Sequence, residues 1–423
     1  MKIVLWHGYL LSATGSNIYT QAVAREWGRA GHEVVVVCQE REPEALDLAG
    51  ARVVRPDVGP VLPVFVLDRY EGFEVKLAQD LTPAERRRYV EANAAAIRAQ
   101  LPADVVFANH VVMGAPVARA AGAPFAVKVH GSELEYAMRL SPDLCEWGGA
   151  ALREAEAVFV GSDHIGRVLA ELVGPVGRVH VVPPGVDVDE FRPRPHDEAL
   201  RDLLAECRRD PPNPGNANER LPDEGNAERL EHFFAEPGPV VLYFGKLLYN
   251  KGVHVLLEAL RGIEARALVV GFGDYRAELE AIAPPTALFT GPLKHRHLVH
   301  LIPLVDAAAV PSIFPEAFGM VAAEAAACGC PPLVARHSGL AEVAAGLERA
   351  YPARHRELVA FETGDSLDLG FRLARLLALP AEERAALGAA ARRAVVENWA
   401  WASVARRLLE PFELRPRAPG AAV

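Results

Sequence analysis

Cysteine and long apolar runs are both scarce in this chain of 423 residues. The five cysteines show no framework spacing, and an odd count of this kind fits a reducing compartment. Cys328 and Cys330 are too close for a CxxC motif, so we expect small buried side chains there. No segment reaches the length of a membrane span. The opening run Met1–Trp6 predicts a strand rather than a signal peptide, and we therefore expect a cytoplasmic protein.

The chain also has fewer positively than negatively charged residues. The chain has 45 lysines and arginines against 55 aspartates and glutamates, which gives a formal net charge of −10. This balance argues against nucleic acid or an anionic membrane as the main partner. A small anionic ligand remains compatible, because a few lysines and helix ends can reverse the potential locally.

The dinucleotide fingerprint GxGxxG is missing from the first βα turn, which disfavours a nicotinamide dehydrogenase. In its place, a small-residue loop at 7–17 connects a strand at 2–6 to a helix that runs to about residue 30. Gly15 and Asn17 lie in this loop, at the sheet edge where doubly wound folds bind ligands. A plain βα turn without a ligand is the alternative.

Strand-like runs alternate with helical segments along the chain, which predicts an α/β fold of two doubly wound domains. The first half has predicted strands at 2–6, 34–38, 104–108, 124–129, 157–160 and 179–182, and the second at 240–244, 267–270, 287–290, 307–310 and 332–335. The predicted parts are a Rossmann-like domain at 1–190, a linker at 191–238 with a flexible polar insertion at about 209–227, a second Rossmann-like domain at 239–396 and a crossover helix at 397–415.

Histidines follow three predicted strands of the first domain, at His7, His110 and His130. They converge on one sheet edge, which would suit a metal trio, but nothing in their spacing supports one. Single polar contacts to a substrate are the favoured interpretation for His130, and an ordinary loop histidine is the alternative. A second group at residues 295, 297 and 300 is better explained by a solvated loop and helix face than by a metal site.

The most informative stretch is 311–330, which follows a strand-like run at 307–310. A loop in this stretch leads into an alanine-rich helix. Exposed amides and the helix dipole at such a start form an anion site. Glu316 and Glu324 flank this start, eight residues apart. A phosphate between hydroxyl-rich rings, as in a nucleotide sugar, would suit these groups. Glutamates that face water on an ordinary strand–loop–helix are the alternative.

The loops after the other predicted strands of the second domain carry the positive charge that the 311–330 stretch lacks. Carboxyl ends of parallel strands meet at one edge, so their loops should lie together. They bring cations for a diphosphate and glycines that allow close backbone approach. The residues are Gly245, Lys246 and Lys251 after the first strand, Gly271 and Gly273 after the second, and Gly291 and Leu293 after the third.

This order of motifs resembles the GT-B retaining glycosyltransferases of family four. The second half carries Gly245-Lys-Leu, Lys251-Gly, Gly271-Phe-Gly, Thr290-Gly-Pro-Leu and Pro315-Glu-Ala-Phe-Gly-Met-Val-Ala-Ala-Glu-Ala. The first half carries the Gly15 loop, His130-Gly-Ser-Glu133 and Pro183-Pro-Gly-Val-Asp187. The resemblance covers nearly the whole chain apart from the 209–227 insertion.

The resemblance implies two Rossmann-like domains that face each other across a cleft, with the last helix crossing back to the first domain. The first domain would bind the acceptor and the second the nucleotide sugar. The implied activity is a hexosyltransferase that moves a sugar from a UDP or GDP sugar, or a related donor, to a hydroxyl of a small molecule or glycan. It would retain the anomeric configuration and need neither metal nor other cofactor.

The resemblance also assigns roles by position. Lys246 and Lys251 would hold the diphosphate, Glu316 would orient the donor sugar, and His130 would face its reacting carbon. Relatives often have arginine at the position of Lys246 and aspartate at that of Glu133. Glu324 would bind the ribose hydroxyls, and the other donor contacts would be Gly15, Gly245, Gly271, Gly273, Leu293 beside the base, and the amides of Phe318, Gly319, Met320 and Val321. The candidates on the acceptor side are Asn17, His110 and Glu133.

Three other functions share this architecture: a GT-B glycoside phosphorylase, a sugar-nucleotide epimerase and a silent sugar-nucleotide-binding protein. The intact glutamates and lysines argue against the silent protein. In the implied mechanism the acceptor attacks the face from which the diphosphate leaves, and the leaving phosphate takes the acceptor's proton. The sequence names neither the sugar, the base, the acceptor nor the oligomeric state.

Overall fold

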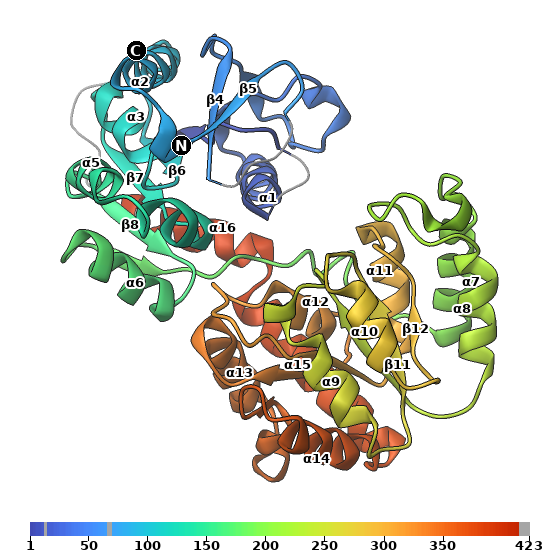
Figure 1. Ribbon diagram of the computed structural model, residues 1–423. Helices are drawn as coiled ribbons and strands as arrows, with labels where there is room; N and C mark the ends of the chain where they lie inside the picture. Colours follow the sequence, from blue (N-terminus) through green and yellow to red (C-terminus); the bar gives the residue numbers. More distant parts are fainter. Residues whose placement is uncertain (12–14, 66–69, 414–423) are drawn as a thin grey trace. The chain divides into compact units, whose positions relative to one another are not determined.

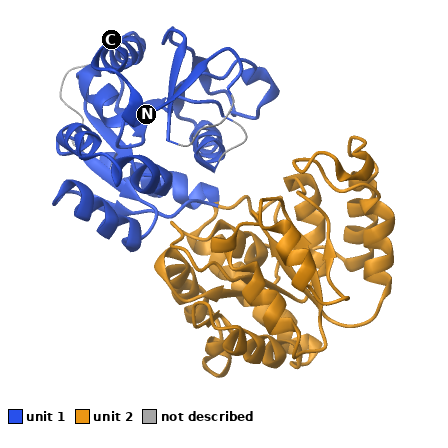
Figure 2. Ribbon diagram, viewed as in Figure 1, with its two compact units in different colours: residues 1–185, 401–423 blue, residues 186–400 orange. Residues whose placement is uncertain are grey.

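The computed structural model describes residues 1–11, 15–65 and 70–413 (Figure 1). The chain divides into two compact α/β units (Figure 2). Unit 1 comprises Met1–Gly185 and Trp401–Val423, and unit 2 comprises Val186–Ala400. The boundaries therefore fall before Val186 and after Ala400, against the predicted boundaries at 190/191 and 396/397.

Unit 1 is built on a seven-stranded parallel sheet in the order β3-β2-β1-β6-β7-β8-β9. Its strands are β1 (Lys2–Trp6), β2 (Glu33–Val37), β3 (Arg52–Val54), β6 (Val105–Asn109), β7 (Phe125–Lys128), β8 (Ala157–Val160) and β9 (Val179–Val181). A separate parallel pair consists of β4 (Val61–Val64) and β5 (Glu74–Leu77). The helices are α1 (Gly15–Arg29), α2 (Pro83–Arg98), α3 (Gly114–Ala121), α4 (Gly131–Glu133), α5 (Pro142–Leu152), α6 (Asp163–Val173) and α16 (Trp401–Glu413).

Unit 2 has a six-stranded parallel sheet in the order β12-β11-β10-β13-β14-β15. Its strands are β10 (Val240–Phe244), β11 (Arg266–Val270), β12 (Leu288–Phe289), β13 (Ala307–Val310), β14 (Pro332–Ala335) and β15 (Ala360–Phe361). Its helices are α7 (His196–Cys207), α8 (Asn226–Ala235), α9 (Val253–Leu260), α10 (Arg276–Ile282), α11 (His295–Leu301), α12 (Met320–Ala327), α13 (Ser338–Ala350), α14 (Ser366–Leu377) and α15 (Ala381–Asn398).

Each predicted strand is present, with ends that differ from the prediction by at most one residue. Apart from Lys2, the central strands β1 and β10 consist of consecutive buried apolar residues, as expected of parallel strands whose two faces are both covered. In both sheets the strand order reverses beside the first strand, between β1 and β6 and between β10 and β13. At such a switch point the loops at the carboxyl ends diverge and leave room for a ligand.

The last helix returns the chain to unit 1. The indole of Trp27 in α1 donates to the carbonyl of Ala405 in α16 at 2.9 Å. Trp401 contacts the ring of Tyr19 edge-on and packs so closely on Gly185 that a Cβ there would lie 2.5 Å from the indole. Trp399 stays in unit 2 and contacts the ring of Phe318 edge-on. The two tryptophans therefore anchor the chain in different units.

Residues 191–238 differ from the predicted linker, because the structure places them within unit 2. Leu203 of α7 and Leu230 of α8 are fully buried in the hydrophobic core of that unit. Between these helices, the buried Asn213 side chain donates to the carbonyls of Asn218 and Pro222 at 3.1 and 3.0 Å. Side-chain hydrogen bonds to the backbone thus organise a polar segment that buries little apolar surface.

The structure also bears on the predictions about membrane spans and cysteines. No helix in the described ranges is long and apolar enough to cross a bilayer. All five cysteines fall within those ranges and are free. Cys328 and Cys330 are buried, as predicted for small core side chains.

Two glycine-rich loops cross at the carboxyl edge of the second sheet. Gly271 has φ 149°, and a Cβ there would lie 1.8 Å from the carbonyl oxygen of Gly245. Gly273 has φ 152°, and its Cβ would lie 2.3 Å from the carbonyl oxygen of Leu247. Only glycine allows both the backbone conformation and the close approach. The loops after β10 and β11 therefore touch through their backbones.

We predict that Gly271→Ala destabilises the protein by more than about 2 kcal/mol, because alanine meets both a disfavoured φ and a carbonyl oxygen. Gly262→Ala is the matched control, since Gly262 has no atom within 4 Å of its would-be Cβ. The control should change the free energy of unfolding by less than about 0.5 kcal/mol. Guanidinium-induced unfolding measures both, and equal midpoints would show that the loops do not need this glycine.

Candidate functional site

The loops after β10 and β13 lie side by side at the switch point of the second sheet. The carbonyl of Asn250 accepts hydrogen bonds from the backbone N–H of Ile313 at 3.0 Å and from the hydroxyl of Ser312 at 3.3 Å. A Cβ on Gly252 would lie 1.9 Å from the carbonyl oxygen of Pro311. These contacts fix the distance between the residues that follow Asn250 and the loop that carries Glu316.

Lys251 and Glu316 form an ion pair across these two loops. The ammonium nitrogen lies 2.5 Å from Oε1 of the carboxylate. Their side chains are 31% and 24% exposed, so water and a ligand can reach both. The sequence predicted each residue for a different part of the donor, and the structure shows that they contact each other.

The backbone around Glu316 is fixed from α13. The hydroxyl of Ser338 accepts the N–H of Glu316 at 2.9 Å, and the N–H of Gly339 donates to the Glu316 carbonyl at 2.9 Å. His337 contacts the carbonyl of Ser312 through Nε2 at 2.7 Å. Sequence reasoning did not assign Ser338 this role, because a serine at a helix start is as readily explained as a cap.

Lys246 presents its side chain to solvent from the neighbouring loop. The phenol of the buried Tyr243 donates to the Lys246 carbonyl at 2.7 Å and fixes its backbone. Burial, with a smaller contribution from Glu316, raises the pKa of Tyr243 above its usual range, so the phenol keeps its proton. An exposed ammonium on a fixed backbone can reach an anionic ligand at this edge.

The helix α12 begins beside the Lys251–Glu316 pair. Gly319, at φ 125°, precedes its first residue, Met320, and a Cβ on Gly319 would lie 2.6 Å from the side chain of Leu340. The ring of Phe318 is buried against Trp399. The amides of Phe318, Gly319, Met320 and Val321 therefore lie at the positive end of the helix, where N–H groups lack intrahelical partners.

Glu324 follows one turn into α12 and contacts His295. His295 Nε2 lies 3.6 Å from Glu324 Oε1, and the ring of Phe191 stands edge-on to the imidazole. The Glu324 carboxylate, supported by Glu190 and Asp187, raises the pKa of His295 against the opposing effect of burial. His295 thus contacts Glu324, which the sequence predicted to bind the donor. The sequence did not predict this contact.

The third loop carries Leu293, which is buried. The N–H of Gly271 donates to the carbonyl of Gly291 at 2.9 Å, which joins this loop to the one after β11. All four predicted loops of unit 2 are thereby brought to one sheet edge, where the sequence placed them.

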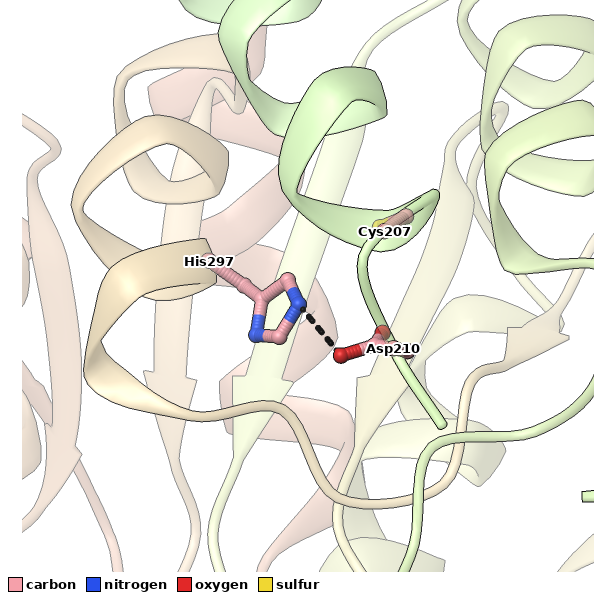
Figure 3. Close-up of side chains that lie close together, drawn as sticks. All are labelled: Cys207, Asp210 and His297. Atoms are coloured by element: carbon pink, nitrogen blue, oxygen red, sulfur yellow. Dashed lines mark ion pairs between the residues drawn. The ribbon is translucent and has the colours of Figure 1, made fainter. Parts of the chain in front are cut away.

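Within the histidine group at 295–300, His295 is exposed, as the sequence favoured, but His297 is fully buried. It lies with Cys207 and Asp210, the one group with metal-ligand spacing in the described part of the chain (Figure 3). The N–H of Lys294 donates to His297 Nδ1 at 3.1 Å, so the neutral ring carries its proton on Nε2. Nε2 faces Asp210 Oδ1 at 3.1 Å and has no lone pair for a metal.

A further observation argues against a metal at this group. Arg296 forms an ion pair with the same oxygen of Asp210. We conclude that Asp210 links α7 to α11 through hydrogen bonds and ion pairs.

In unit 1, His130 lies at the carboxyl end of β7 and is partly exposed. Asn109 donates through Nδ2 to the hydroxyl of Thr20, so its Oδ1 accepts the Nε2 proton of His130 at 2.8 Å. Burial, together with His110, Lys128 and His7, lowers the pKa of His130 well below its usual range. His130 is therefore neutral at pH 7, with the lone pair on Nδ1.

The three predicted residues of the acceptor side lie beneath His130 and are almost fully buried. Glu133 accepts the backbone N–H groups of His130 and Val112 at 3.0 and 3.1 Å. The ring of His110 lies 4.6 Å from that of His130. Asn17 contacts His7 Nε2 at 2.8 Å through Oδ1.

His7, His110 and His130 do not form a group with metal-ligand spacing in the ranges that the structure describes. Burial lowers the pKa of His7 to about 3, so this ring is also neutral. Gly15 is exposed at the start of α1, while residues 12–14 of its loop lie outside the described residues. Lys128, which the sequence did not single out, donates to the carbonyl of Val182 at 2.7 Å and has its pKa lowered by burial to about 7.

Two stretches of the chain match the models of known protein families. Residues 226–394 match the model of glycosyl transferases group 1, and residues 14–185 match that of the glycosyl transferase 4-like domain. The chain is 30% identical over 360 residues to the D-inositol 3-phosphate glycosyltransferase of Xylanimonas cellulosilytica, which covers 78% of this chain and 77% of that protein. It is 26% identical over 324 residues to the GDP-mannose-dependent alpha-(1-6)-phosphatidylinositol monomannoside mannosyltransferase of Mycolicibacterium smegmatis, with 72% and 74% covered.

Solved structures with the same fold extend over the whole chain. Sucrose-phosphate synthase from Thermosynechococcus elongatus superposes with a TM-score of 0.67 at 20% identity, covering 97% of this chain and 98% of that chain. Anabaena HepE in complex with UDP-glucose gives 0.67 at 17%, with 97% and 99% covered. The predicted fold class and family are both confirmed. The chain is an enzyme with the GT-B fold that uses nucleotide-sugar donors and belongs to the group 1 glycosyltransferases.

Proposed function

We propose that the enzyme transfers a sugar from a nucleoside-diphosphate sugar to an acceptor hydroxyl, with retention of anomeric configuration and without a metal ion. The observation that carries the proposal is the Lys251–Glu316 ion pair beside the start of α12. It places an ammonium, a carboxylate and a helix N-terminus at the switch point of the second sheet, which are the groups that a sugar diphosphate needs.

The donor would displace the internal ion pair. A diphosphate carries more negative charge than one carboxylate, so it competes with Glu316 for the ammonium of Lys251 and for the exposed Lys246. The released Glu316 then accepts hydrogen bonds from sugar hydroxyls. Glu324 binds the ribose hydroxyls, and the backbone near Leu293 meets the base.

Catalysis in this proposal rests on charge stabilisation of the leaving group. Negative charge grows on the diphosphate as the anomeric bond breaks, and the two lysines with the α12 amides stabilise it. The acceptor oxygen bonds to the anomeric carbon on the face from which the diphosphate leaves. The acceptor's proton passes to the departing phosphate oxygen, so atoms and charges balance without a carboxylate nucleophile, which retaining hydrolases require.

The contact between His130 of the first domain and the donor sugar stays a prediction. Its neutral ring offers Nδ1 as an acceptor for a sugar hydroxyl, because Nε2 donates to Asn109. We assign Asn17, His110 and Glu133 to positioning this part of unit 1, since all three are buried. For the acceptor, the names of two relatives suggest an inositol-containing molecule, because they include D-inositol 3-phosphate and phosphatidylinositol monomannoside.

The test begins with thermal-shift measurements using UDP, GDP, ADP and TDP sugars, followed by transfer assays with inositol phosphates and related polyols. The anomeric configuration of the first product, read by NMR from the proton coupling constant, should match that of the donor. Activity should persist in excess EDTA. An inverted product, or a covalent glycosyl-enzyme on a glutamate or aspartate, would contradict the proposed mechanism, and transfer to inorganic phosphate would identify a phosphorylase.

We predict that Lys251→Ala lowers kcat by about 10²-fold or more, because it removes a charge that stabilises the leaving diphosphate. Lys76→Ala is the control: Lys76 pairs with Glu85 in unit 1, so the variant loses the same charge away from this edge. Steady-state kinetics with the best donor compare the two. An unchanged kcat/KM in Lys251→Ala would remove this lysine from the site.

A second prediction concerns His295, whose raised pKa depends on Glu324. Because the folded pKa lies above the unfolded value, the stabilisation is complete below about pH 6.5 and is lost as pH rises through the folded pKa. Histidine NMR should give a pKa above the ordinary value in the wild type and a lower one in Glu324→Gln. Glu382→Gln, in the first turn of α15, should leave it unchanged. Equal titration in both variants would disprove the coupling.

A further inference from the structure

The 209–227 segment has no counterpart among the motifs that identify the family, yet it contains a buried carboxylate. Asp223 is 4% exposed and accepts both arms of the Arg276 guanidinium, at 2.8 Å on Oδ1 and 2.6 Å on Oδ2. Arg229 adds a contact at 3.4 Å. The hydrogen bond to Asp223 raises the pKa of Arg276, so the guanidinium stays charged. A buried carboxylate with a bidentate arginine is a strong and geometrically specific contact.

This carboxylate lies against the loop that follows β12. The N–H of Asp223 and the side-chain amide of Asn226 both donate to the carbonyl of Thr290, at 2.9 and 2.8 Å. Arg229 donates to the Phe289 carbonyl at 2.6 Å. A Cβ on Gly291 would lie 2.5 Å from Asp223 Oδ1, so only glycine leaves room for the carboxylate. The backbone that leads into Leu293 is therefore fixed from the segment.

The same carboxylate anchors the neighbouring loop. Arg276 is the first residue of α10, three positions after the Gly271-Phe-Gly273 turn. The guanidinium of Arg220, also in the segment, lies 5.9 Å from the centre of the Phe272 ring. Since Gly271 N–H donates to the Gly291 carbonyl, the two loops and the segment form one connected network.

The start of the segment holds the far side of the Leu293 loop. Asp210 contacts His297 Nε2 at 3.1 Å near the beginning of α11 (Figure 3). Glu206, in the helix α7 that precedes the segment, accepts from Arg296 at 2.7 Å. Residues 291–294 are thus held at one end by Asp223 and at the other by Asp210. A loop fixed at both ends loses less entropy when a ligand binds its backbone.

We propose that Asp223 is a positioning residue that sets the conformation of the 291–294 loop and thereby determines the affinity for, and discrimination among, the nucleobases of the donor. The inference rests on the proposed function, which places the base beside Leu293. Asp223 itself contacts no donor group; it acts through the backbone of Thr290 and Gly291 and through Arg276.

The experiment compares Asp223→Asn with Glu219→Gln, a loss of the same charge at an exposed position of the same segment. Isothermal titration with UDP, GDP, ADP and TDP measures affinity for each base, and inorganic pyrophosphate serves as the base-free probe. We expect Asp223→Asn to lower the affinity for the tightest-binding nucleoside diphosphate roughly tenfold. The differences in affinity among the four nucleoside diphosphates should also become smaller. Pyrophosphate affinity and kcat at saturating donor should stay within about threefold of the wild type.

Arg276→Lys provides a second variant if Asp223→Asn does not fold, as judged by circular dichroism. It keeps the charge and loses the bidentate geometry, and we expect the same loss of base discrimination. Equal base affinities in the Asp223 or Arg276 variant and in Glu219→Gln would overturn the inference while leaving the proposed function intact. A parallel loss of pyrophosphate binding would overturn it as well. A wild-type protein that binds no nucleoside diphosphate would overturn the proposed function itself.

Discussion

The contact on which the unit 2 site depends is the ion pair between Lys251 and Glu316. It connects the loops after β10 and β13, the two strands that flank the switch point of the sheet. Both side chains of the pair are partly exposed. Under the proposed function, a more highly charged ligand replaces the carboxylate beside Lys251. The neighbouring contacts, from Gly252 on Pro311 to Ser338 on Glu316, keep the two charges within reach of each other.

Much of the fold followed from the sequence because its central strands are continuous apolar runs. β10 and β13 were predicted with the bounds that the structure shows. The strands that were missed, β3, β4, β5 and β15, are short or carry charged residues or proline: β4 contains Pro63, and β5 alternates charged with apolar residues. Such segments form strands only through their neighbours, which a single sequence does not display.

The candidate site could be predicted to the level of loops but not of contacts. Topology alone brings the carboxyl ends of parallel strands together, so Lys246, Lys251, Glu316 and Glu324 were placed on one edge. Their partners depend on loop conformation. Nothing in the sequence links Asp223 to Arg276, 53 positions away, or shows that Ser338 accepts the N–H of Glu316. For the same reason, the polar composition at 209–227 suggested a loose insertion where the structure shows a hydrogen-bonded network.

The most direct test is a crystal structure of the full chain with an unreactive analogue of the preferred nucleoside-diphosphate sugar bound. We predict that Lys251 leaves Glu316 and contacts a diphosphate oxygen, while Glu316 accepts hydrogen bonds from sugar hydroxyls and Glu324 from the ribose. A structure in which the 2.5 Å ion pair persists with the donor bound would contradict this prediction.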